Sequence, residues 1–446
     1  MQRFSFGFLF LAALYVSAEA NATAEQPVPA KLLAASSVQA ASSVQGAAPV
    51  AAPIPVPELP PLVADNPAPH IALLLPLKSK STVLARYAEV VQQGFMAAAS
   101  VQQGLPVRVY ASIDETKDVI TQYRQAIANG AMAVAGPLTR DGVATLAGFS
   151  GITIPTLALN ISETPNSAQK LYFFGLPAEN EARQIAQIAA AAELRNATII
   201  STGATSSKRL AAAFADEWKK LGGSVTAEIV FKDDFEVLKN LPVAPWPEGT
   251  EPQPASAVSA TGEPIVNDRP LPPPIAPGNM AFLAADHEKA RLIRPYLSNP
   301  TLPIYATSQL FQGNTDKLAN YDLYEVRFVD MPWLLQPDHP AVMIYPRAAA
   351  ALEPDMERLY ALGIDAYRLA HILLTNRIDS SLPLDGVTGR LSLDHQQFLR
   401  EPVPAFFRQG MGLTAETLAA LNAAKAAAKA AAKQIEDGSS SPSPAK

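Results

Sequence analysis

Short apolar runs alternate with amphipathic segments from His70 onward, and no other feature constrains the fold of this chain as strongly. Residues 71–77 form an apolar run of strand length, and apolar side chains then recur at helical spacing over residues 84–98. The same unit recurs at residues 106–139 and at residues 141–160. Near-continuous apolar strands that alternate with such helices predict a parallel sheet covered on both faces and joined by right-handed crossovers.

The pattern starts a second time after residue 175 and predicts a second lobe of the same kind. A helix over residues 180–194 opens this part, and a further helix is expected over residues 287–297. The expected strands cover residues 197–202, 224–231, 279–286 and 302–309. The fold class is therefore α/β with two doubly wound, Rossmann-like lobes, and two such lobes define a cleft between them.

Four segments differ from the lobes in composition. Residues 1–22 read as a cleaved signal peptide, because Arg3 precedes an apolar run shorter than the ~20 residues of a spanning helix. Residues 23–69 form a linker rich in proline and alanine. Residues 241–277 form a proline-rich insert, either a tolerated surface insertion or a docking segment for a partner. Residues 411–446 are expected to form a helical tail rich in alanine and lysine with a disordered end.

Charge and cysteine content exclude several classes of function. The chain has 41 acidic and 35 basic residues, a net charge of -6, so no nucleic-acid partner is expected. It contains no cysteine, which excludes disulfides and thiol chemistry on these residues. A lipoprotein is acylated on a cysteine, so we expect an exported periplasmic protein without a lipid anchor.

Polar residues follow several of the expected strands and are the candidates for a binding site. In open α/β sheets, ligands bind outside the carboxyl ends of the strands. Hydroxyls, an amide and one carboxylate at these ends are suited to a small zwitterion such as an amino acid. The same residue types cap helices and close turns, so both interpretations stay open. The candidates for an inter-lobe site are Ser79, Thr139, Asn160, Thr205, Asp286, Thr307 and Ser308.

Enzymatic chemistry has little support in the sequence. The five histidines are scattered without HxxxH or HExxH spacing, so we expect neither a metal site nor a catalytic histidine. No GxSxG motif is present, and the segment GATSSK at residues 203–208 lacks the spacing of a phosphate-binding loop. We therefore expect a protein without catalytic residues and without a cofactor.

An ordered set of phrases resembles a known family. The phrases IALLLPL, FLAADHEKARLIRPYL, LPIYATSQ, VRFVDMPWLL and RLYALGIDAYRLA occur in this order. Together they resemble the C-terminal domain of the LpoA/LppC family of penicillin-binding protein activators, over residues 70–410. The two lobes likewise resemble the type I periplasmic-binding-protein fold. By this resemblance lobe A covers residues 70–174 and 326–378, and lobe B covers residues 175–325 and 379–410.

The resemblance implies a protein that acts by contact. Members of this family bind a class A penicillin-binding protein and stimulate peptidoglycan cross-linking, and their best-known members are outer-membrane lipoproteins. Peptidoglycan itself and a small amino-acid-like molecule are further candidate ligands. The alternative function is that of a periplasmic solute-binding protein for an amino-acid-type ABC importer, whose lobes close around the solute.

Overall fold

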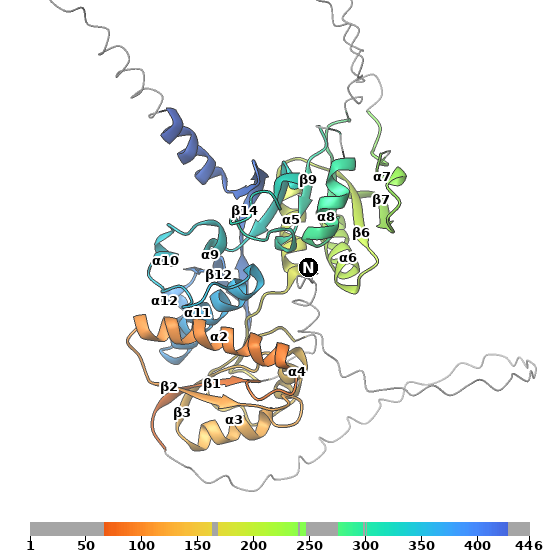
Figure 1. Cartoon of the computed structure of the whole chain (residues 1–446). Coiled ribbons are helices and arrows are strands. Elements are labelled where there is room, and N and C mark those ends of the chain that lie inside the picture. The colour runs from red at the N-terminus through yellow and green to blue at the C-terminus, as the bar shows by residue number, and fades with distance from the viewer. Residues whose placement is uncertain are drawn as a thin grey trace, which may run out of the picture.

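The computed structural model describes residues 67–162, 168–239, 241–246, 275–297, 299 and 301–426 (Figure 1). The expected signal peptide, nearly all of the linker, the centre of the proline-rich insert and the end of the tail lie outside the described residues. Residues 415–426 are helical, as expected for the start of the tail. None of the helices in the described ranges combines the length and the apolar character that crossing a membrane requires.

Lobe A is built on an eight-stranded sheet with helices on both faces. Its strand order is β11-β12-β13-β5-β4-β3-β1-β2. The strands are β1 (His70–Leu75), β2 (Val107–Ala111), β3 (Ala131–Ala135), β4 (Thr156–Ala158), β5 (Leu171–Phe173), β11 (Leu384–Asp385), β12 (Arg390–Asp394) and β13 (Gln397–Glu401). The helices are α2 (Thr82–Val101), α3 (Val119–Ala128), α4 (Arg140–Ala147), α11 (Pro354–Leu374) and the short α12 (Ile378–Ser381).

The alternation of side chains along β1 divides the core of lobe A in two. Ile71 and Leu73 belong to the cluster that packs against α2 and α11. Ala72 and Leu74 point to the opposite face and belong to the cluster that includes α3 and α4. All six residues of β1 are buried, as the apolar run predicts for a central strand of a parallel sheet.

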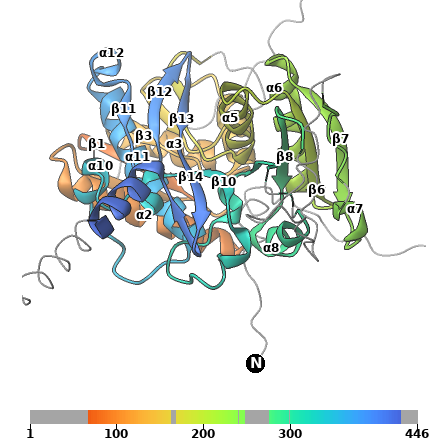
Figure 2. The ribbon, with the colours of Figure 1, turned by 90° about the horizontal axis from the view of Figure 1, so that it is seen from above.

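Lobe B repeats this design on a seven-stranded sheet with the order β15-β14-β10-β9-β8-β6-β7 (Figure 2). The strands are β6 (Asn196–Thr202), β7 (Ser224–Phe231), β8 (Asn279–Ala284), β9 (Ile304–Ala306), β10 (Val326–Asp330), β14 (Val403–Arg408) and β15 (Met411–Leu413). The helices are α5 (Ala178–Ala191), α6 (Thr205–Lys220), α7 (Glu236–Lys239) and α8 (His287–Ile293), with 3-10 turns η1 (Arg294–Tyr296), η2 (Ser308–Leu310) and η3 (Tyr321–Leu323). One core lies against α5 and α6, and the other includes residues of α8, η2 and η3.

The chain crosses between the lobes three times. The first crossover joins β5 to α5, the second joins β10 to α11, and the third joins β13 to β14 through Pro402. The second crossover carries two short helices, α9 (Pro332–Leu335) and α10 (Pro340–Met343). Several crossovers between the two lobes are what the resemblance to the type I periplasmic-binding-protein fold implies.

Two of the expected lobe boundaries are wrong. Residues 326–330 were assigned to lobe A, but β10 pairs with β9 and β14 in the sheet of lobe B. Residues 379–410 are expected in lobe B, but β11, β12 and β13 extend the sheet of lobe A and only β14 of this range belongs to lobe B. Both errors arise because long-range strand pairing, which the local pattern does not encode, decides to which sheet these strands belong. Residues 411–413, expected in the tail, form β15 at the edge of the lobe B sheet.

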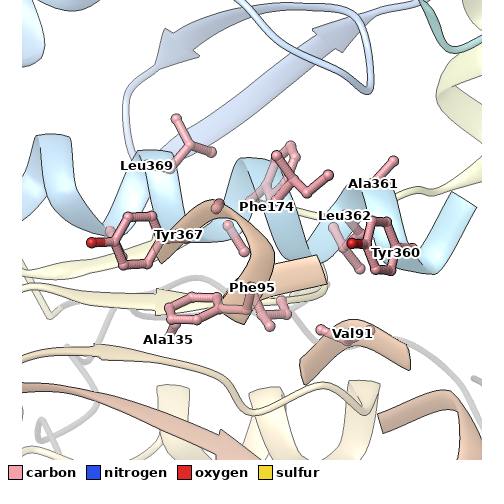
Figure 3. Close-up of a cluster of buried hydrophobic side chains, with 14 of the residues drawn as sticks. Val91, Phe95, Ala135, Phe174, Tyr360, Ala361, Leu362, Tyr367 and Leu369 are labelled. Carbon is pink, nitrogen blue, oxygen red and sulfur yellow. The ribbon is translucent and has the colours of Figure 1, made fainter. Parts of the chain in front are cut away.

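Backbone contact between α2 and α11 forms the centre of lobe A (Figure 3). A Cβ atom on Gly94 would overlap the carbonyl oxygen of Tyr360, and one on Gly363 would overlap the carbonyl oxygen of Val91. The two glycines therefore let the helices approach with no side chain between them at these points. Phe95 fills the adjacent space and meets Tyr367 edge to face, with ring centroids 5.2 Å apart.

Candidate functional site

The candidate residues of lobe A are engaged in local hydrogen bonds. Ser79 lies in the turn after β1, where its hydroxyl accepts from the backbone N–H of Ser81 at 3.2 Å. Thr139 caps α4 by accepting from the N–H of Gly142 at 3.1 Å. Asn160 is buried and donates from Nδ2 to the carbonyl oxygen of Leu138 at 3.0 Å. The structure thus brings Thr139 and Asn160 together on the loop that enters α4, where both fix the backbone.

Glu115 is a buried carboxylate at the same loop that the sequence did not single out. Its side chain accepts from the hydroxyl of Thr139 at 2.6 Å and from the N–H groups of Thr139 and Leu138 at 2.7 and 3.2 Å. Burial raises the pKa of Glu115 to about 7, although these three hydrogen bonds favour the ionised form. The residue lies in the loop after β2, and the contact is long-range, so local sequence carries no signal for it.

The candidates of lobe B begin two helices. Thr205 is the first residue of α6 and is exposed to solvent. Asp286 caps α8 by accepting from the N–H of Lys289 at 3.0 Å. The starts of the two helices are neighbours, because the hydroxyl of Ser207 donates to the carbonyl oxygen of Ala284 at the end of β8. Asp286 therefore fulfils the capping role that the sequence left open.

Thr307 and Ser308 lie at the hinge between the lobes, where both are buried. The Ser308 N–H donates to Oε2 of Glu181 at 3.0 Å, and its carbonyl oxygen accepts from Arg358 at 3.1 Å. The hydroxyl of Thr307 is fully buried and has no hydrogen-bond partner within the described part of the chain. The backbone of Ser308 thus connects two groups of charged residues.

The first of these groups is an ion pair across the second crossover. Arg358 of α11 in lobe A donates to Asp330 at the end of β10 in lobe B, at 2.6 Å. Arg358 also binds Asp355 at 2.6 Å and the carbonyl oxygen of Phe311 at 2.9 Å. Burial alone would lower the pKa of Arg358, but the charges of Asp330 and Asp355 raise it above its ordinary value. The guanidinium therefore stays charged and joins the lobes in a water-poor environment.

The second group connects the first and third crossovers. Glu181 in the first turn of α5 accepts from Arg400 of β13 at 2.5 Å, and both side chains are almost completely buried. Arg400 also donates to the carbonyl oxygen of Thr388 at 3.2 Å in lobe A. Nearby, Gln184 of α5 donates to the carbonyl oxygen of Pro402 at 3.0 Å. We call Glu181, Asp330, Arg358 and Arg400 the hinge network.

A third contact between the lobes lies where the predicted ligand site would be. Arg140, the residue after Thr139, lies 3.8 Å from the Glu179 carboxylate of α5. Arg209 of α6 pairs with the same carboxylate. Arginines of both lobes therefore meet on one internal carboxylate, a group of the chain itself. Within the described residues there is no group of three or more side chains suited to hold a metal ion.

Comparison with known proteins decides the family. A family model described as "LppC putative lipoprotein" matches residues 36–404. The chain belongs to the LppC family.

Relatives of this LppC protein include proteins named penicillin-binding protein activator LpoA from Yersinia pseudotuberculosis serotype O:1b (strain IP 31758) and Vibrio cholerae serotype O1 (strain M66-2). The first is 26% identical over 399 residues, which cover 76% of this chain and 60% of the relative. The second is 27% identical over 337 residues, which cover 73% of this chain and 54% of the relative. The chain thus spans little more than half the length of these relatives.

Solved structures show the same fold. The LpoA C-domain from Haemophilus influenzae, described as a regulator of PBP1A, has a TM-score of 0.58 at 22% identity and covers 77% of this chain and 99% of its own. A protein from Chromobacterium violaceum is described as a "putative branched-chain amino acid ABC transporter". Its TM-score is 0.60 at 34% identity, and the match covers 76% of this chain and 100% of that protein. The type I periplasmic-binding-protein fold expected from the sequence is confirmed.

The family description bears on the expected location. It names lipoproteins, whereas the absence of cysteine from these 446 residues led us to expect a protein without a lipid anchor. The family name does not support that expectation. The names of the relatives, activator and regulator, agree with the expectation that the chain acts on another protein.

Proposed function

We propose that this LppC protein binds a class A penicillin-binding protein in the cell envelope and raises the rate at which it cross-links peptidoglycan. It acts by contact and contributes no catalytic residue. Family membership and the names of the relatives support this proposal. The partner, the location in the periplasm and the mode of attachment to the envelope are part of the proposal.

The hinge network is the observation that favours contact over solute transport. A solute-binding protein closes its lobes by changing backbone angles at the crossovers. Here Arg358 and Asp330 fix the second crossover, while Glu181 and Arg400 join the first to the third. Separating one buried pair leaves uncompensated charge, which typically costs about 3–5 kcal/mol. The lobes therefore keep one arrangement, which suits a protein whose surface is its functional part.

Three of the seven candidate side chains support the same conclusion. Thr139, Asn160 and Asp286 use their polar atoms to hold loops and helix starts. Arg140 of lobe A and Arg209 of lobe B bind Glu179 of the chain itself. A site for an amino acid needs polar groups that are available to the ligand.

Solute binding is the second candidate function. It is favoured by the 34% identity to the Chromobacterium violaceum protein described as a transporter component. Under this proposal Ser79, Thr139, Asn160, Thr205, Asp286, Thr307 and Ser308 would line the ligand site, and binding would need rearrangement of several of their hydrogen bonds. Calorimetric titration of the full chain with the common amino acids tests it directly.

The test of the leading proposal is a cross-linking assay. The full chain is added to a purified class A penicillin-binding protein from the same cell, and the fraction of cross-linked peptide is followed with time. We expect a higher rate in proportion to occupancy of the partner. An active synthase that does not bind the added chain and keeps its cross-linking rate would exclude the proposal. Binding of an amino acid in the titration would favour solute transport in its place.

A further inference from the structure

The segment between α9 and α11, residues 336–353, includes the short helix α10 and presents two large apolar side chains to solvent. We call this segment the loop. Met343 is 67% exposed and its neighbour Ile344 is 53% exposed. Pro346 and the three alanines at positions 349–351 are exposed on the same loop. Single exposed apolar side chains are ordinary in soluble proteins, but several on one short segment form a candidate contact surface.

The loop is anchored on the core of lobe A. Val342 and Tyr345, which flank the exposed pair, are buried in the main core cluster. The hydroxyl of Tyr345 accepts from Nε2 of Gln102 at 3.2 Å. The guanidinium of Arg347 lies 3.7 Å from the ring centroid of Trp333 and donates to its carbonyl oxygen at 3.1 Å. Because the backbone is fixed on both sides of Met343 and Ile344, little ordering is needed when this loop binds.

The scarcity of charged residues makes this loop an apolar contact surface. Between His339 and Glu353 the only charged residue is Arg347, and it already pairs with Glu357 at 3.7 Å. Interface cores are depleted of charged residues, because each charge must be desolvated on binding. The loop therefore complements an apolar groove that is likewise poor in charge.

A second exposed apolar surface lies on lobe B and is less suitable. Leu318 and Tyr321 are 79% and 65% exposed. Three exposed charged residues, Asp316, Lys317 and Asp322, flank them along the chain. Covering this surface would bury charge, so we treat it as the control.

We propose that Met343 and Ile344 insert into an apolar, charge-poor groove of the class A penicillin-binding protein that the chain activates. This inference rests on the proposed function. A second copy of the chain is the alternative occupant, and the mass measurement in the experiment below tests for it. In both views α10 lies at the rim of the ribbon, where a groove of another protein can receive the loop (Figures 1 and 2).

The experiment compares two matched double variants of the full chain. Met343→Lys with Ile344→Lys alters the proposed contact, and Leu318→Lys with Tyr321→Lys places the same charges on the control surface. Affinity for the purified synthase is measured by biolayer interferometry, and stimulation by the cross-linking assay. Circular dichroism shows that both variants fold, and light scattering after size exclusion gives the mass of each.

We expect the first variant to lose at least about tenfold in affinity, with stimulation lost in parallel, because apolar anchor residues dominate binding energy. The control variant should bind like the wild type.

Equal binding by all three proteins overturns the docking proposal and leaves the proposed function intact. Loss only in the control variant moves the contact to lobe B. Conversion of a wild-type dimer to a monomer by the first variant makes the second copy the occupant. Absence of wild-type binding to an active synthase contradicts the proposed function itself.

Discussion

At the scale of single residues, Glu115 predicts a pH dependence of stability. Burial raises its pKa from 4.5 to about 7, so the folded chain retains a proton that the unfolded chain releases at lower pH. The stabilisation is therefore complete below pH 4.5 and is lost as the pH rises through 7. The loss is on the order of 3 kcal/mol in the free energy of unfolding, from 1.36 kcal/mol for each pH unit. Urea midpoints measured from pH 5 to pH 8 should fall accordingly.

The substitution Glu115→Gln isolates this effect. Glutamine does not ionise, so its urea midpoint should vary less over this pH range than that of the wild type. Glu228→Gln, at an exposed position of β7, serves as the control and should keep the wild-type slope. Identical slopes for the wild type and Glu115→Gln would contradict the assignment.

Arg358 predicts a large loss of stability on truncation. Arg358→Ala leaves the Asp330 carboxylate buried without its cation, which should lower the free energy of unfolding by about 3–5 kcal/mol. The double variant Arg358→Met with Asp330→Asn removes both charges and should recover part of that loss. Thermal unfolding of Arg358→Met, Asp330→Asn and the double variant measures the coupling. Strictly additive losses would show that the pair does not act as one unit.

The sequence predicts the positions of the candidate residues better than their partners. Thr139, Asn160 and Asp286 do follow strands, because polar residues end apolar runs in any α/β sheet. What their side chains bind depends on loops distant in sequence. Glu181 and Arg400 are 219 residues apart, and no local pattern connects them. The hinge network was for this reason invisible at the level of motifs.

At the scale of elements, α2 and α11 predict strict sensitivity to side-chain volume at their contact. Gly363→Ala places a methyl group against the backbone of Val91, which cannot withdraw as a flexible side chain does. Overpacking of a core costs typically 1–3 kcal/mol, and we expect a loss of at least about 2 kcal/mol in the free energy of unfolding. Gly203→Ala has open space around its new methyl group and should be neutral. An unchanged urea midpoint for Gly363→Ala would show that the helices can separate without cost.

Elements with long apolar runs were predicted well, and short ones at the crossovers were not. Residues 71–77 and 84–98 correspond to β1 and α2, where burial and helical spacing dominate the local pattern. The strands β10 to β13 were assigned to the wrong lobes. Each has only two to five residues, and β10 owes its place to pairing with β14, which lies more than seventy residues later. Chain crossings are decided by such pairings, which a single sequence does not reveal.

At the scale of the whole molecule, the hinge network predicts lobes that keep a fixed distance. The chain has no cysteine, so Lys80→Cys in lobe A and Lys208→Cys in lobe B can carry one dye each, and both positions are exposed. Single-molecule energy transfer should give one narrow distance distribution. Addition of amino acids should leave it unchanged, because closure would have to disturb buried ion pairs at the crossovers.

The same labelled chain with Arg400→Gln and Arg358→Met tests whether the network is the cause. Without Arg400, Glu181 no longer joins the first crossover to the third, and without Arg358, Asp330 no longer joins β10 to α11. The distance distribution should therefore broaden. A distribution that stays narrow would place the rigidity elsewhere, such as in the Arg140–Glu179 contact between the lobes. A wild-type distribution that shifts on addition of one amino acid would show that the ion pairs permit rotation. In that case solute binding, and not a fixed surface, would account for the two-lobed fold.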